Sequence, residues 1–166
     1  MTSDIVLRDV TEGDLTIFFE QQLDPDANRM AAFTAKDPAD GDAFTVHWTK
    51  ILGDDAITIK TMLFEGRVAG HVLSFERFGK PEVSYRLGKR YWGKGIATQA
   101  LSEFLGHVPL RPLYARAAND NIASIRVLEK CGFTITGEDK GFSNARGVGV
   151  EESILILTGN ERDGAQ

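Results

Sequence analysis

Residues 83–98 read VSYRLGKRYWGKGIAT and are the most informative stretch of the chain. Apolar and polar residues alternate up to Leu87, which predicts a β-strand, and apolar residues at helical spacing begin at Ile96. The basic turn between them contains glycines, which let a ligand approach the backbone closely. The helix that follows offers unpaired N–H groups and a partial positive charge to an anion. The layout therefore predicts a ligand that carries phosphate.

Three phosphate-binding patterns come close to this turn. Residues 88–94 nearly satisfy the nucleotide P-loop, but Gly95 stands where a P-loop has the hydroxyl that holds magnesium. The dinucleotide pattern G-x-G-x-x-G fails because Thr98 occupies the place of its third glycine. The arrangement Arg90-x-x-Gly93-x-Gly95 matches [RQ]-x-x-G-x-[GA] and so resembles the GNAT superfamily of acyl-CoA-dependent N-acyltransferases, which holds the coenzyme A pyrophosphate with this signature.

A second motif supports the same resemblance. Residues 119–133 read NDNIASIRVLEKCGF, and from Asn121 onward they are similar to N-x-x-S-x-x-x-x-x-K-x-G-F of the branch that includes ribosomal-protein N-terminal acetyltransferases. The first motif is read from a turn after a strand and the second from a helix, so the two are independent. The resemblance extends from an opening strand at residues 7–8 to a closing strand at residues 153–157.

The order of elements predicts a mixed α/β sheet. The GNAT resemblance implies the α/β (α+β) fold of that family, with a mostly antiparallel central sheet of about seven strands and about four helices. The expected strands lie near residues 5–8, 56–64, 67–75, 82–87, 113–117, 133–137 and 152–157. The expected helices begin near residues 11, 40 or 42, 96 and 121. Residues 24–28 and 36–41 are interpreted as turn-rich loops, and residues 141–149 as a mobile glycine-rich loop.

Composition limits the class of protein. The 166 residues predict a single domain, residues 1–166, and their net charge of −5 disfavours binding to nucleic acid. One cysteine, Cys131, excludes an internal disulfide, and three scattered histidines give no spacing for a metal site. No apolar run reaches the ~20 residues of a membrane span, and the N-terminus does not resemble a signal peptide. We therefore expect a cytoplasmic protein with no membrane partner and no metal.

The GNAT resemblance implies a cofactor, acetyl-CoA, and the residues that hold it. Backbone N–H groups in the turn would hold the pyrophosphate, and Arg90 and Lys94 would add positive charge, although both also fit a solvated surface pair. The strand before the turn would part from its neighbour, so that the backbone of Leu87 could pair with the pantetheine arm. Asn119, Asn121 and Ser124 would also contact the cofactor, with helix capping as the alternative role of Asn121. The turn residues concerned are Trp92, Gly93, Lys94, Gly95, Ile96, Ala97 and Thr98.

Three residues receive catalytic roles from the resemblance. The Leu87 N–H is the expected oxyanion donor. Some family members have a tyrosine acid where this chain has Leu128, so Ser124 is the candidate acid, unless its hydroxyl only bonds backbone groups near the helix start. Glu82 is the candidate base, and because Arg86 shares its strand face, a surface ion pair between the two is the alternative.

Other residues near these positions are weaker candidates. Glu76 is a second, weaker candidate base, and Tyr85 belongs either to the core or to the acceptor site. Cys131 precedes a helix-ending Gly-Phe pair and is interpreted as a small buried side chain instead of a nucleophile.

The expected function is transfer of an acetyl group from acetyl-CoA to a primary amine, by direct attack in a ternary complex. The amine belongs to a protein N-terminus or to a small molecule, and its site is expected between residues 24–43 and 141–149. Two alternatives stay open: a non-catalytic acyl-CoA sensor or interaction module, and a P-loop nucleotide hydrolase. A homodimer is compatible with this reading, and the sequence does not specify one.

Overall fold

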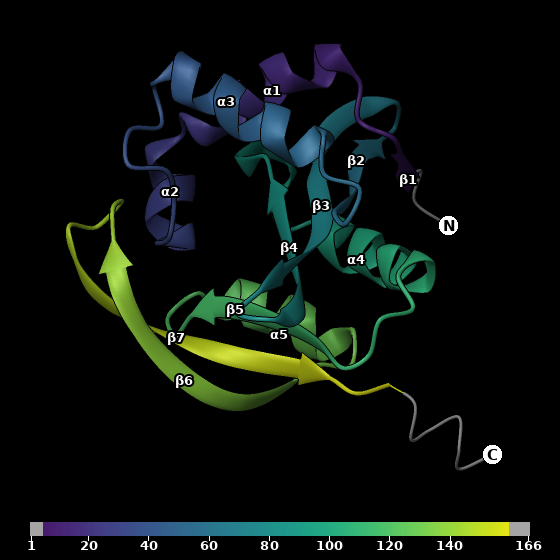
Figure 1. Ribbon diagram of the computed structural model, residues 1–166, viewed down its shortest axis with the longest axis vertical. Coiled ribbons are helices and arrows are strands. Elements are labelled where there is room, and N and C mark those ends of the chain that lie inside the picture. The colour runs from purple at the N-terminus through teal and green to yellow at the C-terminus, as the bar shows by residue number, and fades with distance from the viewer. Residues whose placement is uncertain (1–4, 160–166) are drawn as a thin grey trace.

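The structure is a computed structural model that describes residues 5–159. It contains one seven-stranded sheet, five α-helices and a short 3-10 helix (Figure 1). The strands are β1 (Ile5–Arg8), β2 (Thr58–Phe64), β3 (Arg67–Arg77), β4 (Lys80–Leu87), β5 (Leu113–Ala118), β6 (Thr134–Ser143) and β7 (Val148–Leu157). The helices are α1 (Glu12–Gln22), α2 (Pro25–Ala31), α3 (Gly41–Leu52), η1 (Lys89–Tyr91), α4 (Ile96–His107) and α5 (Ile122–Lys130).

The strands follow the order β1-β2-β3-β4-β5-β7-β6. All neighbours are antiparallel except β4 and β5, which are parallel and are connected through α4. The hairpin between β2 and β3 turns at Glu65 and Gly66, both with positive φ, as two-residue hairpin turns of this kind require. The predicted mixed, mostly antiparallel seven-stranded sheet is therefore confirmed.

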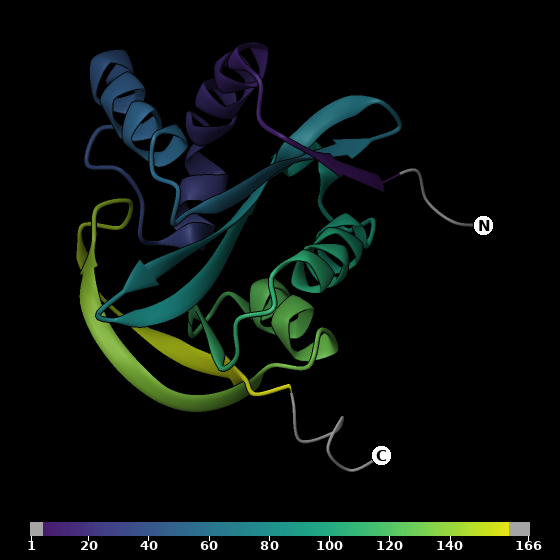
Figure 2. The same ribbon diagram turned by 45° about the vertical axis from the view of Figure 1, so that its right-hand side comes forward.

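Two hydrophobic clusters cover opposite faces of the sheet. Helices α4 and α5 pack on one face, where Phe104, Leu101 and Leu128 meet β-strand residues such as Val72 and Val83 in the main core. Helices α1 and α3 cover part of the other face through a smaller cluster built on Phe18, Trp48 and Ile51. Figure 2 shows these two helical layers on either side of the sheet. Within residues 5–159, no helix is long and apolar enough to cross a membrane.

The structure contains a fifth helix, α2, where the sequence predicted a turn-rich loop at residues 24–28. The same residues that indicate a turn also start a helix. Asp24 accepts hydrogen bonds from the N–H groups of Asp26 and Ala27, and Pro25 occupies the first helical position, where its missing N–H costs nothing. The prediction at this segment was wrong because one turn of polar residues does not distinguish a loop from a capped short helix.

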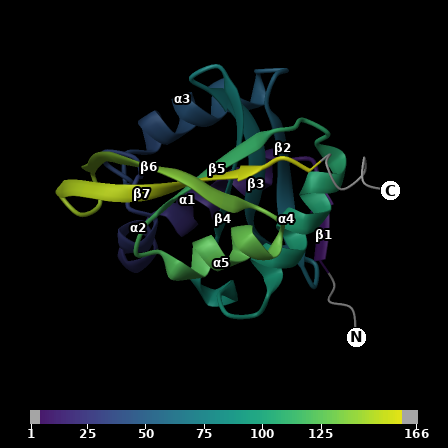
Figure 3. The same ribbon diagram turned by 90° about the horizontal axis from the view of Figure 1, so that it is seen from below.

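The glycine-rich loop predicted at residues 141–149 is shorter in the structure. Strands β6 and β7 continue through most of it, with Phe142 paired to Gly149, and leave only residues 144–147 as the turn. The tip of this hairpin reaches α2 and the segment after it (Figures 1 and 3). There Arg146 Nε donates to the Arg29 carbonyl at 2.8 Å, and Asn144 Nδ2 donates to the Thr34 carbonyl at 3.0 Å.

Candidate active site

The sheet opens between β4 and β5. These parallel strands pair at one register position, Glu82 with Tyr114, and share no other paired position along their described lengths. The Gly88 N–H donates to the Ala69 carbonyl on β3 at 2.8 Å. Because successive residues of a strand direct their N–H groups to opposite sides, the N–H of Leu87 points away from β3. It is therefore directed toward the opening on the β5 side.

The Trp92 side chain connects the turn that follows β4 to the end of that strand. Its indole Nε1 donates to the Leu87 carbonyl at 3.0 Å, so the start of the turn is tied to the end of the strand. Gly93 and Gly95 have φ of +76° and +77°, a left-handed conformation that glycine adopts at little cost. A Cβ at either glycine would meet no atom within 4 Å, so the turn leaves open space beside its backbone.

Helix α4 starts directly after Gly95 and has no side-chain cap. The Gln99 N–H donates to the Gly95 carbonyl at 3.2 Å, which leaves the N–H groups of residues 96–98 ahead of the first intrahelical bond. Arg90 and Lys94 are exposed on the same turn. These orphan donors, the helix dipole and two cations fit a pyrophosphate, as the sequence predicted for coenzyme A.

Helix α5 brings Ser124 to the same region. Asn121 caps this helix, because its Oδ1 accepts a hydrogen bond from the Ser124 N–H at 3.2 Å. The Ser124 hydroxyl has a different partner: the Tyr85 hydroxyl on β4 donates to Ser124 Oγ at 3.1 Å. Both readings of Asn121 remain compatible with this arrangement, because capping uses only one of its side-chain groups.

Tyr85 joins this region through a contact that the sequence analysis did not anticipate. Its ring is partly buried against the main core, and its hydroxyl reaches Ser124 across 39 positions of sequence. Burial raises the pKa of Tyr85, and the hydrogen bond to Ser124 lowers it by less. The phenol therefore stays protonated near neutral pH and can act as a donor. A contact between two elements that are distant in sequence produces no local sequence pattern. The sequence therefore placed Tyr85 on one face of β4 but did not predict its contact with Ser124.

Other predicted residues have structural partners. Asn119 Oδ1 accepts from the Ser153 hydroxyl at 2.6 Å, which directs that oxygen toward β7. Leu128 is buried in the main core. Cys131 is half-buried, its Sγ lies 3.6 Å from the Thr98 carbonyl, and burial raises the pKa of its thiol. A protonated, half-buried thiol is a poor nucleophile, in line with the sequence interpretation.

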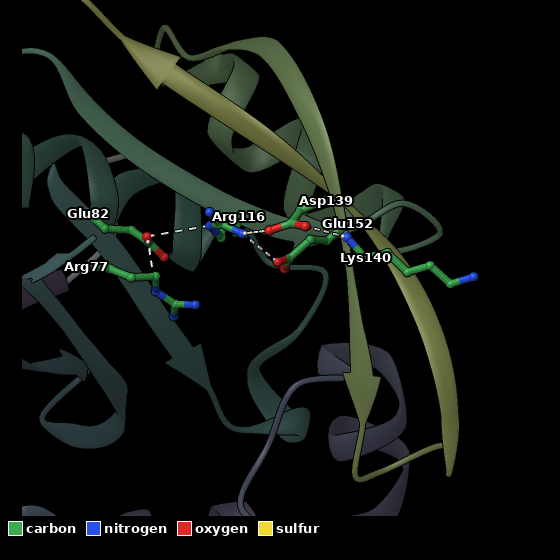
Figure 4. Close-up of polar contacts among 6 residues, drawn as sticks. All are labelled: Arg77, Glu82, Arg116, Asp139, Lys140 and Glu152. Carbon is green, nitrogen blue, oxygen red and sulfur yellow. Dashed lines mark hydrogen bonds and ion pairs between the residues drawn. The ribbon is translucent and has the colours of Figure 1, made fainter. Parts of the chain in front are cut away.

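Glu82 lies in a network of ion pairs on the other face of β4 (Figure 4). The residue is only 5% exposed. Its Oε1 is 3.3 Å from Arg77 Nε and 3.7 Å from Arg116 Nε. Arg116 also donates to Glu152 at 2.9 Å and to Asp139 at 3.0 Å. The network thus links β3, β4, β5, β6 and β7 beside the parallel pair.

The expected ion pair between Glu82 and Arg86 is not formed. Although the two residues share a strand face, Arg77 and Arg116 contact Glu82, and Arg86 contacts Asn28 instead. Burial raises the pKa of Glu82, Arg77 and Arg116 lower it, and Glu152 raises it, with a net increase. A carboxylate with a raised pKa is a stronger base than a solvated one, which suits proton abstraction.

A groove of about 1320 Å³ lies over this face of β3 and β4. The predicted acceptor segments contribute to its wall, including Phe33 and Asp40 from residues 24–43 and Gly141 from residues 141–149. Tyr85 and Ser124 also line it, so the groove reaches the opening between β4 and β5. Within residues 5–159, no group of three or more His, Cys, Asp or Glu side chains is placed to hold a metal ion.

Comparison with known families decides the assignment. A profile described as the acetyltransferase (GNAT) domain matches residues 4–134 of the chain. The chain belongs to the GNAT acetyltransferase family. A curated relative, an uncharacterized N-acetyltransferase named p20 from Bacillus licheniformis, is 27% identical over 90 residues. That match covers 52% of this chain and about half of the relative, 51%.

Solved GNAT structures share the fold at low sequence identity. A putative phosphinothricin N-acetyltransferase has a TM-score of 0.78 and 22% identity, covering 93% of this chain and 98% of its own. Mycobacterium smegmatis RimJ, in complex with CoA-disulfide, has a TM-score of 0.78 and 21% identity over 95% of this chain and 83% of its own. Vibrio cholerae spermidine N-acetyltransferase, in complex with CoA and spermine, has a TM-score of 0.73 and 20% identity, covering 92% of this chain and 95% of its own.

Proposed function

We propose that this protein is an acetyl-CoA-dependent N-acetyltransferase that acts on a primary amine by direct attack. Membership of the GNAT family supports this proposal. The observation that carries it is the opening between β4 and β5, which lies between the Tyr85–Ser124 hydrogen bond from β4 to α5 and a glycine turn suited to pyrophosphate. The opening meets a groove that contains a buried carboxylate, so donor and acceptor sites are adjacent.

The turn and the start of α4 would hold the cofactor. The N–H groups of residues 93–98, with Arg90 and Lys94, would bind the pyrophosphate. The Trp92 N–H was also expected to bind it, but it donates to the Lys89 carbonyl at 3.1 Å. Leu87 would pair with the pantetheine arm along the unpaired side of β4, and Asn119 and Asn121 would add contacts from the β5–α5 side. Acetyl-CoA, when bound, supplies an acetyl group activated as a thioester.

Two side chains and one backbone N–H would carry out the chemistry. Glu82, directly or through water, would accept the proton that an ammonium group must lose before it can attack. The Leu87 N–H would donate to the acetyl oxygen as negative charge develops there. Ser124 would donate a proton to the departing sulfur, and the Tyr85 hydroxyl, which already donates to Ser124 Oγ, would return a proton to Ser124. The amine nitrogen would lose its second proton to water as the amide forms, and Tyr85 would recover its own proton from water.

The acceptor would enter by the groove. The second sequence motif resembles the branch that acetylates protein N-termini, and among similar proteins the spermidine acetyltransferase holds spermine, a small amine. Both a protein N-terminus and a small-molecule amine are therefore acceptors that a test must include.

The test is acetyl-CoA turnover measured as free thiol, with and without a panel of primary amines. We expect thiol release that depends on an amine and yields acetylated product. Release should fall about 10²-fold or more in Ser124→Ala, since general acid catalysis contributes on that order. Tight binding of acetyl-CoA with no amine-dependent release would contradict the proposal and favour the acyl-CoA sensor.

A further inference from the structure

Arg86 lies on the floor of the groove. Glu82, Ser84 and Arg86 project from the same face of β4, and all three line the groove. The neighbouring position on β3 is His71, which is paired in register with Arg86 and also lines the groove. The guanidinium therefore lies in the space where the acceptor is proposed to bind.

The guanidinium of Arg86 has a single protein acceptor. Its Nη2 donates to Asn28 Oδ1 at 2.5 Å. Asn28 is itself buried, and its Nδ2 donates to the Gln22 carbonyl at 2.8 Å, which fixes the orientation of the amide. A guanidinium carries five N–H donors, so four of them have no acceptor among residues 5–159.

Arg86 also differs in charge pairing from the other arginines of the groove. Arg77 and Arg116 both lie within 4 Å of Glu82, and Arg116 also bonds Glu152. No carboxylate among the described residues lies within that distance of the Arg86 guanidinium. Burial lowers the pKa of Arg86, and the more distant Asp24 raises it. A half-buried cation without a counter-charge is costly unless a ligand supplies one.

His71, the neighbour of Arg86 on β3, supplies no counter-charge to the guanidinium. Its Nδ1 is buried and has no hydrogen-bond partner among the described residues. Burial, followed by the charges of Arg86 and His47, lowers the pKa of His71 to about 3, so its ring is neutral near pH 7. A neutral ring nitrogen can donate or accept one hydrogen bond, and it adds no positive charge beside Arg86.

We propose that the acceptor is a small amine that also carries a carboxylate, and that Arg86 binds this carboxylate. The inference rests on the proposed acetyltransferase function. Two adjacent N–H donors of a guanidinium match the two oxygens of a carboxylate. Arg86 and Glu82 lie four residues apart, ~13 Å along the strand, and their side chains extend toward the same groove. One small molecule can therefore place its carboxylate at Arg86 and its amine toward Glu82.

The test compares each acid with its carboxamide, which removes the negative charge and keeps the size. L-leucine and 5-aminopentanoate, which differ in the distance between amine and carboxylate, are assayed against L-leucinamide and 5-aminopentanamide. We expect the acid to exceed the amide by about 10- to 100-fold in kcat/KM for at least one pair, the ratio for a charged hydrogen bond. A tetrapeptide amide without acidic groups is assayed in parallel and represents a protein N-terminus as the acceptor.

Variants test whether the preference for the acid depends on Arg86. In Arg86→Gln, kcat/KM should become about equal for acid and amide, mainly because KM for the acid rises. Arg86→Lys should retain part of the preference for the acid. The matched control is Arg67→Gln, at an exposed residue of the β2–β3 hairpin outside the groove. Its ratio should equal that of the wild type. Acetyl-CoA affinity, measured by calorimetry, should be the same in all four proteins.

Several results would overturn the inference. Equal rates with acid and amide, a preference for the amide, or acetylation of the peptide alone would each contradict an Arg86–carboxylate contact. So would absence of acetylation of both acids by protein that binds acetyl-CoA normally, or an unchanged acid preference in Arg86→Gln. Failure to bind acetyl-CoA at all would instead contradict the proposed function on which the inference rests.

Discussion

Burial and charge act in opposite directions on Glu82. Removal from water favours the neutral acid, whereas Arg77 and Arg116 favour the carboxylate. The balance leaves a pKa above the ordinary value of 4.5. Such a carboxylate accepts a proton more readily than a solvated glutamate.

For Glu82→Gln we predict a fall in kcat/KM of about 10²-fold or more, because the glutamine cannot accept the amine proton. In the wild type the rate should fall as pH drops through the pKa of Glu82, at a pH above 4.5. This acid limb should be absent from the variant. Rates are measured from pH 4.5 to 9 at saturating acetyl-CoA.

The control for this prediction is Glu138→Gln, at an exposed residue of β6 that does not line the groove. It should retain the rate and the acid limb. An unchanged rate in Glu82→Gln, with normal thermal unfolding, would show that Glu82 is only a structural ion-pair partner.

The contacts of single residues were the hardest part to predict. Alternation along β4 correctly placed Glu82 and Arg86 on one face, but not their partners. Those partners, Arg77, Arg116 and Asn28, come from β3, β5 and α2. A local pattern cannot weigh a same-strand neighbour against residues that tertiary packing brings closer.

At the scale of elements, the turn before α4 depends on backbone conformation more than on side chains. Gly95 is left-handed at the helix start, with no side-chain cap. Gly106 is in the same helix, without a positive φ, and a Cβ there would also meet nothing within 4 Å. An added Cβ has room at both glycines, so the two positions differ only in backbone conformation and in their place in the helix.

This pair yields opposite predictions for one substitution. Gly95→Ala should destabilise the protein by about 1–2 kcal/mol, because an L-residue is strained in this conformation, and it should weaken acetyl-CoA binding. Gly106→Ala should stabilise it by about 0.5–1 kcal/mol, because alanine favours a helix, and leave acetyl-CoA binding unchanged. Urea unfolding and calorimetry measure both effects. Equal effects of the two substitutions would argue against a specific role of the turn.

Elements with start and stop signals were predictable from the sequence. Gly95 precedes α4 and Asn121 caps α5, as expected, and α3 is capped by Asp40, one of the two positions expected for its start. The turn at residues 65–66 lies between the strands expected at residues 56–64 and 67–75. The β6–β7 hairpin was underestimated because glycine at 141, 147 and 149 suggested a loop. Strand pairing between β6 and β7 outweighs that local tendency.

At the scale of the whole molecule, Asp14 joins three elements at one end of the sheet. It is 3% exposed and accepts hydrogen bonds from Arg8 on β1, the Thr11 N–H before α1, and the Thr61 hydroxyl on β2. Burial raises the pKa of Asp14, but these hydrogen bonds and the charge of Arg8 hold it well below its usual range.

Asp14→Asn should therefore lower the free energy of unfolding by about 2–3 kcal/mol at pH 7, the scale of hydrogen bonds to a charged group. Because the folded pKa is depressed, this contribution is present above the unfolded pKa and is lost as pH falls through the folded pKa. The difference from wild type should thus shrink below about pH 4. Urea unfolding at pH 7 and pH 3 measures it.

Asp55→Asn, at an exposed position after α3, is the matched control and should change stability little at either pH. A loss in Asp14→Asn that is equally large at pH 3 and pH 7 would indicate a packing effect instead of a charge effect.

The arrangement of the whole sheet followed from the family resemblance more than from propensity. Alternation and helical spacing gave the elements, but the divergence of β4 from β5 depends on how two separate packed layers meet. The GNAT resemblance supplied that expectation, and the single paired position at Glu82 and Tyr114 agrees with it. The acceptor site was expected at residues 24–43 and 141–149, but the groove wall also includes residues of α1, α3 and five strands, which no local pattern brings together.

Thermal unfolding with acetyl-CoA, free CoA and Mg-ATP in parallel tests the central claim most directly, namely that the turn before α4 is an acyl-CoA site. A ligand at ~100 times its Kd stabilises by ~2.7 kcal/mol, which for a protein of this size raises Tm by roughly 5–10 °C. We predict this rise with acetyl-CoA and CoA and none with Mg-ATP. A rise with Mg-ATP alone, or with none of the three, would contradict the account.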